Sequence, residues 1–491
     1  MTTDEEALRR LAVRTLMPGF AGTTVPDWIR REYAAGLAAV CLYGSNVVGS
    51  EQFSSLCADL RAAAPDLLLA VDEEGGDVTR VHFATGSPHA GNAVLGRLDD
   101  LDLTRASAVA IGRELTASGI TLDLAPVVDV NSADDNPVIG VRSFGRDPAL
   151  VARHSAAFVE GLQSVGVAAC AKHFPGHGDT VTDSHLALPR IDVSRELLAD
   201  RELVPFRAAV AAGSACIMTS HIVVTAIDAD HPATFSSRVL GDVLRDELCY
   251  DGVVVTDALD MAGASADTGI PEAAVRALVA GCDLLCVGSE TSEEQFLEVV
   301  DAVVAAVATG RLDRVRLEQA VSRVESLTST FAPGRVRGAG SVGERPASSP
   351  VSDAAITRAF EIGPEVAAWL ADPARAVVVQ LASSTNQAVG DVRWGPAAVG
   401  RAVDATEVVA GDKVAVVGRG LSERHPAWAL VERLRSQGHS AIVVECGWPR
   451  SGGPAAPDIV TFGGSPAVGR ALADLLGGAV GEPVSDEEVV G

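Results

Sequence analysis

The segment 172–185, with the sequence KHFPGHGDTVTDSH, concentrates side chains that can carry charge or move protons: one lysine, three histidines and two aspartates. Its first residue, Lys172, is one of only two lysines among the 39 basic residues of the chain. Because the chain uses arginine almost everywhere else, a lysine here indicates a site that needs a compact, strongly hydrated charge instead of a planar guanidinium group. We therefore expect a catalytic or binding site in this segment.

Short apolar runs followed by helical patterns recur through the first two-thirds of the chain, and these elements would position such a site. Helices are predicted where apolar residues recur three and four positions apart, as in 51–63, 195–212 and 293–308. Strand and helix in alternation predict a parallel sheet, and eight repeats predict closure into a (β/α)8 TIM-type barrel in the α/β class. The eight runs predicted as strands are 11–17, 37–42, 67–71, 120–124, 167–171, 215–218, 252–255 and 283–287.

The remainder of the chain is predicted to hold a second domain. The segment 333–352 is rich in Pro, Gly, Ser and Arg and lacks hydrophobic periodicity, so it is predicted to be a linker. It separates a catalytic barrel domain at 1–332 from residues 353–491, where alternating strands and helices predict a smaller open α/β domain of the αβα sandwich type. The last residues, 482–491, form an acidic tail that is predicted to be disordered.

Five of the predicted barrel strands end in polar residues. The active site of a barrel is built at the carboxyl ends of its strands, so these residues are predicted to meet at one mouth. Each has an ordinary explanation alone, since an aspartate can cap a helix and a histidine can be a satisfied core residue, but five together favour an active site. These strand ends carry Asp72 with Glu73 and Glu74, Asp129, Lys172 with His173, Ser220 with His221, and Thr256 with Asp257.

Two acid–base groups at such a mouth indicate glycoside hydrolysis, in which one group attacks the anomeric carbon and another protonates the leaving oxygen. Asp257 follows a buried valine run and is predicted to be the nucleophile, while Asp260 is the rival three residues on. No glutamate lies in the loop after the fifth strand to act as the acid. Instead, Asp183 can orient His185 and stabilise its protonated form, which makes a dyad the predicted acid–base group.

A metal site is the alternative interpretation of the same loop. Its spacing lacks the helical H-E-x-x-H and strand-borne H-x-H patterns, and Lys172 would place a cation beside any metal, so no metal or other cofactor is expected. The residues that could act as ligands are His173, His177, Asp179, Asp183 and His185.

Composition restricts the partners and the compartment. The net charge of -26 and the lack of a basic cluster exclude nucleic acid as an expected partner. We find no signal-peptide pattern and no apolar run of about 18 residues, so the protein is expected to be cytoplasmic and not to bind a membrane. The eight cysteines are scattered without a C-x-x-C pair, which predicts reduced thiols.

Four segments together resemble family 3 glycoside hydrolases, in the β-N-acetylglucosaminidase branch. They are the K-H-F-P-G-H-G-x4-D-S-H pattern at 172–185, the strand end VVVTDALDM at 253–261, the run at 72–80, and PVVDVN at 126–131 continuing to RSFG at 142–145. The resemblance implies that Asp257 forms a covalent glycosyl intermediate and that Asp183 with His185 is the acid–base pair. The sugar contacts that it implies fall on Asp72, Arg80, Arg142, Lys172 and His173, with Asp129 and His221 as further candidates.

The third strand end departs from the family pattern. The family usually has Q-E-G-G-R where this chain has Glu73, Glu74, Gly75, Gly76 and Asp77. A basic residue has therefore become acidic at position 77, which puts in doubt any salt bridge made there.

The sequence predicts a cytoplasmic, retaining exo-β-N-acetylglucosaminidase of the β-N-acetylhexosaminidase type. It would release terminal GlcNAc from peptidoglycan-derived or chitin-derived fragments by double displacement, without a cofactor. A phosphorylase that yields GlcNAc 1-phosphate is the alternative, because a neutral histidine repels inorganic phosphate less than a carboxylate does. A metal-dependent barrel hydrolase and a non-catalytic sugar-binding protein are the remaining alternatives.

Overall fold

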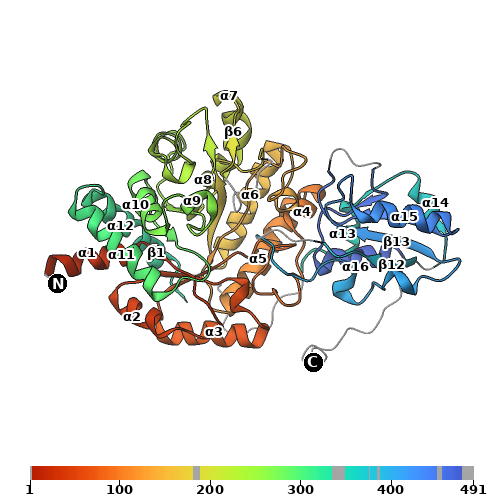
Figure 1. Cartoon of the computed structure of the whole chain (residues 1–491), viewed down its shortest axis with the longest axis horizontal. Coiled ribbons are helices and arrows are strands. Elements are labelled where there is room, and N and C mark those ends of the chain that lie inside the picture. Colours follow the sequence, from red (N-terminus) through yellow and green to blue (C-terminus); the bar gives the residue numbers. More distant parts are fainter. Residues whose placement is uncertain are drawn as a thin grey trace.

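The computed structural model describes residues 3–180, 188–333, 349–374, 376–383, 388–450 and 456–477. Asp183 and His185, the predicted acid–base dyad, lie outside the described residues, as do most of the predicted linker and the whole acidic tail. The described chain forms a barrel and a smaller second domain beside it (Figure 1).

Eight parallel strands form the barrel. Six of them lie in one sheet in the order β2, β3, β4, β5, β7 and β9, and β1 pairs with β10. A bridge between Val255 and Leu284 joins β9 to β10, and the Cys41 amide donates to the Pro18 carbonyl at 3.0 Å to join β2 to the end of β1. The predicted barrel is thereby confirmed. Its strands are β1 (Leu16–Met17), β2 (Ala39–Cys41), β3 (Leu68–Val71), β4 (Leu122–Asp123), β5 (Ala168–Phe174), β7 (Cys216–Thr219), β9 (Val253–Val255) and β10 (Leu285–Cys286).

Helices cover the outside of the barrel. Several begin at an aspartate or serine whose side chain caps the first turn by accepting hydrogen bonds from backbone amides. Asp100 accepts bonds from the amides of Asp102 and Leu103, and Ser292 accepts one from Gln295. The covering helices are α2 (Asp27–Ala35), α3 (Ser50–Ala63), α4 (Asn92–Leu98), α5 (Leu101–Ala117), α6 (Pro148–Ser164), α7 (Arg195–Leu197), η3 (Leu198–Glu202), α8 (Leu203–Ala211), η5 (Arg238–Glu247), α9 (Ala262–Ser265), α10 (Ile270–Ala280), α11 (Glu293–Ala308) and α12 (Arg314–Thr330).

One strand prediction is largely wrong. Residues 11–14 belong to the helix α1 (Thr3–Arg14), and only Leu16–Met17 form a strand. The apolar run is part of a helical face, since Leu8, Ala12 and Val13 are buried together. The helix ends where the Thr15 hydroxyl donates to the Ala12 carbonyl at 2.8 Å.

The interior of the barrel is filled by small and flexible side chains. Alternate residues of the strands point inward, and those of this inner cluster include Cys41, Ala70, Cys170, Cys216 and Cys286. None of the eight cysteines is in a disulfide, and seven of them are buried. The use of Ala, Cys and Val here explains how a chain with 4% aromatic residues still fills a large core.

A buried carboxylate holds the last barrel strand at its amino end. Asp283 is fully buried and accepts hydrogen bonds from Arg245 and Arg316, each at 2.6 Å, and from the Val254 amide at 3.0 Å. Arg323 lies 3.3 Å away from the same carboxylate. In a barrel the amino ends of the strands serve stability rather than chemistry.

The second domain is an open sheet in the order β11, β15, β14, β13, β12, in which all neighbours are parallel except β11 and β15. The predicted alternation of strands and helices in this part of the chain is confirmed. Its elements are α13 (Asp353–Ala359), β11 (Glu361–Ile362), α14 (Val366–Ala371), β12 (Ala376–Gln380), β13 (Lys413–Gly418), α15 (Pro426–Ser436), β14 (Ser440–Glu445), β15 (Ile459–Val460) and α16 (Pro466–Leu475).

The second domain packs against the barrel beside α4 (Figure 1). Arg97 of α4 donates through Nε to the Ala359 carbonyl at 2.5 Å, and its guanidinium lies 4.0 Å from the centre of the Phe462 ring. Within the described ranges, no helix has the length and apolar character needed to cross a membrane.

Replacing Asp283 should reduce stability without changing the chemistry. Asp283→Asn removes the only carboxylate that these three arginines share and should lower the free energy of unfolding by about 3–5 kcal/mol. The matched control is Asp251→Asn, because Asp251 is exposed in the loop before β9. Thermal unfolding measures the effect. A kcat/KM that falls with Asp283→Asn at a temperature where the variant is folded would contradict a purely structural role.

Candidate active site

A cavity of about 770 Å³ lies at the carboxyl ends of the barrel strands. Its lining combines charged side chains, here called the charged wall, with the apolar side chains of Leu124, Val138 and Met218. Six of the residues for which the resemblance implies a catalytic or sugar-binding role line this cavity: Asp72, Arg80, Arg142, Lys172, His173 and Asp257.

Lys172 lies at the centre of the charged wall. It projects from β5 and is 2% exposed, and its Nζ lies 2.5 Å from Asp72 Oδ1 and 2.8 Å from Glu74 Oε1. Burial alone would lower the pKa of the Lys172 ammonium, but Asp72 and Glu74 outweigh it and raise that pKa above its usual range. The lysine is therefore a permanent cation beside two carboxylates.

Glu74 joins Lys172 to Arg142. The guanidinium of Arg142 donates to Glu74 through Nε at 2.9 Å and through Nη2 at 2.7 Å, in the paired geometry that carboxylates favour. Burial favours the neutral acid, yet Arg142 and Lys172 together hold the pKa of Glu74 well below its usual range. In the sequence, Glu74 is recognisable only as part of a polar strand end. Nothing in the sequence shows that it bridges Arg142 and Lys172, which lie 30 residues apart.

Asp129 lies beneath the cavity and positions two histidines. Its Oδ2 lies 2.7 Å from His173 Nδ1, and its Oδ1 accepts the His177 amide at 2.7 Å. Asp129 is fully buried and does not line the cavity. Since Nδ1 of His173 is engaged by Asp129, Nε2 is the ring nitrogen that can bond a ligand.

His177 also lines the cavity, although it was considered only as a metal ligand. Its Nδ1 lies 2.8 Å from the Thr180 hydroxyl. Burial, reinforced by the neighbouring His173, lowers the pKa of His177 to about 4. The ring is therefore neutral at physiological pH and can act as a hydrogen-bonding group in the wall.

Asp257 stands at the end of β9, where the backbone is held on both sides. The Cys286 amide donates to the Thr256 hydroxyl at 3.0 Å, and the Ala258 amide donates to Asp257 Oδ1 at 2.8 Å. Asp260 lines the same cavity from the following turn and accepts the Ser289 amide at 3.0 Å. Both carboxylates reach the cavity, but only Asp257 follows directly from a barrel strand.

His221 is not among the residues that line the cavity. It is fully buried, with Nδ1 at 2.9 Å from the Thr234 hydroxyl and Nε2 at 3.0 Å from the Ala258 carbonyl. The arrangement matches the alternative of a satisfied core histidine. Through Ala258 it supports the backbone next to Asp257.

The two departures from the family pattern each make a structural contact. Glu73 Oε2 accepts hydrogen bonds from the Thr79 hydroxyl and from the amides of Arg80 and Val81, at 2.8 to 3.0 Å. Asp77 accepts the Gly464 amide at 2.8 Å and lies 3.1 Å from Arg419, and both partners belong to the second domain. The acidic residue at 77 therefore links the barrel to the second domain.

The second domain also reaches the cavity. Arg80 Nη2 donates to the Ala388 carbonyl at 2.8 Å, and Ala388 and Gly390 line the cavity wall. Arg80 lies 3.9 Å from Asp72, so the contact connects the second domain to the charged wall. Sequence analysis missed this contribution, because 308 residues separate the partners and no local pattern marks the loop.

The loop that leads to the predicted dyad is packed tightly where it is described. A Cβ at Gly178 would lie 1.7 Å from the Val130 carbonyl oxygen, so only glycine fits there. The Asn136 side chain donates to the His177 carbonyl at 2.9 Å. The chain up to Thr180 is thus fixed beside Asp129, while Asp183 and His185 follow outside the described residues.

Comparison with known proteins gives a consistent result. The model of the N-terminal domain of glycosyl hydrolase family 3 matches residues 18–327. A β-hexosaminidase from Stenotrophomonas maltophilia (strain K279a) is 38% identical over 297 residues, which are 58% of this chain and 86% of the relative. Beta-hexosaminidase A from Pseudoalteromonas piscicida is 35% identical over 317 residues, and the chain spans only 53% of that relative's length.

Solved structures extend the similarity to the second domain. A family 3 β-N-acetylglucosaminidase from Paenibacillus sp. str. FPU-7 superposes with a TM-score of 0.83 at 31% identity, covering 96% of this chain and 97% of that one. A β-N-acetylhexosaminidase from Beutenbergia cavernae DSM 12333 is 33% identical with a TM-score of 0.59, covering 66% of this chain and 98% of its own. This chain belongs to glycoside hydrolase family 3, as its motifs predicted.

Removing the buried lysine should affect both binding and stability. Lys172→Met leaves Asp72 and Glu74 without their shared cation, so we expect a loss of about 3–5 kcal/mol in unfolding free energy and a KM raised by roughly tenfold or more. Lys413→Met is the matched control, because the chain's other lysine is also buried but lies in the second domain. Steady-state kinetics and thermal unfolding separate the two effects. An unchanged KM in folded Lys172→Met protein would contradict the proposed contact with the sugar.

The buried Glu202, the last residue of η3, should make the stability of the protein depend on pH. Burial raises its pKa to about 7 against the opposing charge of Arg201. Since the unfolded value is about 4.3, its contribution to stability is complete below pH 4 and is lost as the pH rises to 7, by roughly 2–4 kcal/mol. Glu202→Gln should flatten the fall in melting temperature between pH 5 and pH 8. Glu196→Gln, at an exposed glutamate six residues earlier, should leave it unchanged; parallel profiles for wild type and Glu202→Gln would refute the assignment.

Proposed function

We propose that this protein is a retaining exo-β-N-acetylglucosaminidase, which removes terminal GlcNAc with Asp257 as nucleophile. The observation that carries the proposal is the position of Asp257, which stands at the end of β9 in the cavity that Asp72, Lys172 and His173 also line. Membership of glycoside hydrolase family 3 supports this substrate class. So do the relatives, which are named as β-hexosaminidases and a β-N-acetylglucosaminidase.

The charged wall suits a sugar that must be held firmly. Asp72 offers carboxylate oxygens as hydrogen-bond acceptors, and three residues offer donors: Arg80, Lys172 and His173. The hydroxyl groups of a pyranose can therefore both donate and accept hydrogen bonds here. The apolar side chains of Leu124, Val138 and Met218 can contact the ring faces or the acetamido methyl group. Binding energy from these contacts would place the anomeric carbon against Asp257.

In the proposed mechanism, an Asp257 carboxylate oxygen bonds to C1 while the bond from C1 to the aglycone oxygen breaks. His185, oriented by Asp183, gives its proton to the departing oxygen. The neutral imidazole then accepts a proton from water as the water oxygen bonds to C1 and Asp257 leaves. Two displacements return the original β configuration, and no cofactor takes part.

The proposed natural substrates are fragments of peptidoglycan or chitin, and the proposed compartment is the cytoplasm. The substrate class follows from the resemblance in the sequence motifs, and incubation of the enzyme with defined fragments tests it directly. Fractionation of cells that express the protein tests the compartment.

Substitution of the nucleophile tests the proposal. Asp257→Asn keeps the shape of the side chain but removes its charge, so kcat on an aryl β-GlcNAc substrate should fall by roughly 10³-fold or more while the melting temperature changes little. The control is Asp260→Asn, which changes the rival carboxylate on the same cavity and should cost much less. A larger loss for Asp260→Asn than for Asp257→Asn would reverse the assignment.

Product analysis separates hydrolysis from the phosphorylase alternative. With aryl β-GlcNAc in buffered water, NMR should detect β-GlcNAc as the first anomer formed, and added phosphate should change neither rate nor product. Formation of GlcNAc 1-phosphate at a phosphate-dependent rate would identify a phosphorylase instead. The α-anomer as the first product would contradict double displacement.

A further inference from the structure

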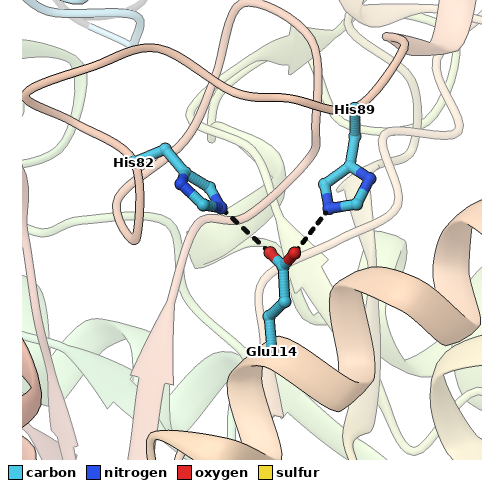
Figure 2. Close-up of side chains that lie close together, drawn as sticks. All are labelled: His82, His89 and Glu114. Carbon is cyan, nitrogen blue, oxygen red and sulfur yellow. Dashed lines mark hydrogen bonds and ion pairs between the residues drawn. The ribbon is translucent and has the colours of Figure 1, made fainter. Parts of the chain in front are cut away.

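A cluster of two histidines and a glutamate lies outside the cavity, between the loop after β3 and the helix α5. His82 and His89 approach the carboxylate of Glu114 from opposite sides (Figure 2). His82 Nε2 lies 2.9 Å from Oε2, and His89 Nε2 lies 3.2 Å from Oε1. The side chains of His89 and Glu114 are buried, at 0% and 3% exposure, whereas His82 is 20% exposed. The mechanism proposed above uses none of the three.

Hydrogen bonding within the described residues satisfies this cluster only in part. His82 bonds to Oε2, whereas His89 Nε2 contacts Oε1 as an ion pair at 3.2 Å that lacks hydrogen-bond geometry. A buried polar atom without a partner costs about 1–3 kcal/mol. An ion pair without hydrogen-bond geometry offsets only part of this cost, and a cation bound by both atoms would offset more of it.

The ligand atoms are arranged as a divalent cation requires. One nitrogen from each histidine and one carboxylate oxygen all lie within 4.8 Å of one another. Two ligands of one zinc ion lie at most about 4.2 Å apart, since Zn–N and Zn–O bonds are about 2.0–2.2 Å long. Small side-chain rotations would therefore close the site.

We propose that His82, His89 and Glu114 form a binding site for a late first-row divalent cation such as Zn²⁺. Two imidazoles and a carboxylate make a ligand set that zinc accepts, while Ca²⁺ and Mg²⁺ require oxygen ligands. The ion would satisfy Nε2 of His89 and Oε1 of Glu114 together. It would enter from the side of His82, the only exposed ligand, where water can fill a fourth position.

The position of the site gives the ion a structural role. Its histidines lie on the loop that begins with Asp72 and Glu74 and continues through Arg80, two residues before His82. Glu114 lies on α5, a rigid helix of the barrel wall. A cation that links them would fix the loop that supplies one side of the cavity and the contact from Arg80 to the second domain.

Zinc titration of the full-length protein tests the proposal. Chelator-treated enzyme should bind one Zn²⁺ per chain by calorimetry, and saturating zinc should raise the melting temperature by roughly 2–4 °C. His82→Gln and Glu114→Gln each remove one ligand while keeping a polar side chain, and both should weaken binding at least tenfold and abolish the shift. The matched control is His231→Gln, because His231 forms a comparable histidine–carboxylate pair with Asp228 at 3.3 Å on the surface; it should bind zinc like the wild type.

Anomalous scattering at the zinc edge from a zinc-soaked crystal of the wild-type protein locates the ion directly. This measurement does not depend on whether the variants fold. A peak between His82, His89 and Glu114 is the expected result. No binding by the wild type at 100-fold excess zinc, equal affinity in His82→Gln, or a peak only beside His173 and Asp257 would each overturn the proposal.

Discussion

The buried charge balance around Lys172 is the constraint on which the rest of the site depends. Lys172 and Arg142 meet Asp72 and Glu74 in a region almost without solvent. A buried charge is tolerated only when it is paired and hydrogen-bonded, so each of these side chains fixes the others. Because they come from the ends of β3 and β5 and from the loop after β4, the network also fixes the relative position of the loops that form the cavity.

The same constraint explains why the two domains form one site. Arg80 completes the charged wall and donates to a carbonyl of the second domain, and Asp77 binds that domain through Gly464 and Arg419. The acidic residue at 77, which in sequence looked like a lost salt bridge, makes its own contacts with the second domain. His82 and His89 belong to the same loop, and their contacts with Glu114 connect it to α5.

Much of this arrangement follows from the sequence. Strands bounded by polar residues predicted the barrel and its mouth, and the rarity of lysine marked Lys172 as a functional choice. What could not be predicted depends on contacts between distant segments. Glu74 bridges two cations through the fold, Ala388 reaches the cavity from another domain, and His221 looks like a site residue by its place after β7 but is satisfied within the core. Residues 11–14 were misassigned because a short apolar run does not distinguish a strand from one face of a helix.

The central claim is that Asp257 and the Asp183–His185 pair act on the two sides of one glycosidic bond in the cavity. A crystal structure of the enzyme after reaction with a slow fluorinated GlcNAc donor tests it most directly. We expect a covalent bond between C1 and an Asp257 oxygen, with Lys172 and Asp72 on the sugar hydroxyls and His185 on the opposite side of C1. A sugar attached to Asp260, or His185 turned into a separate cavity in that complex, would contradict it.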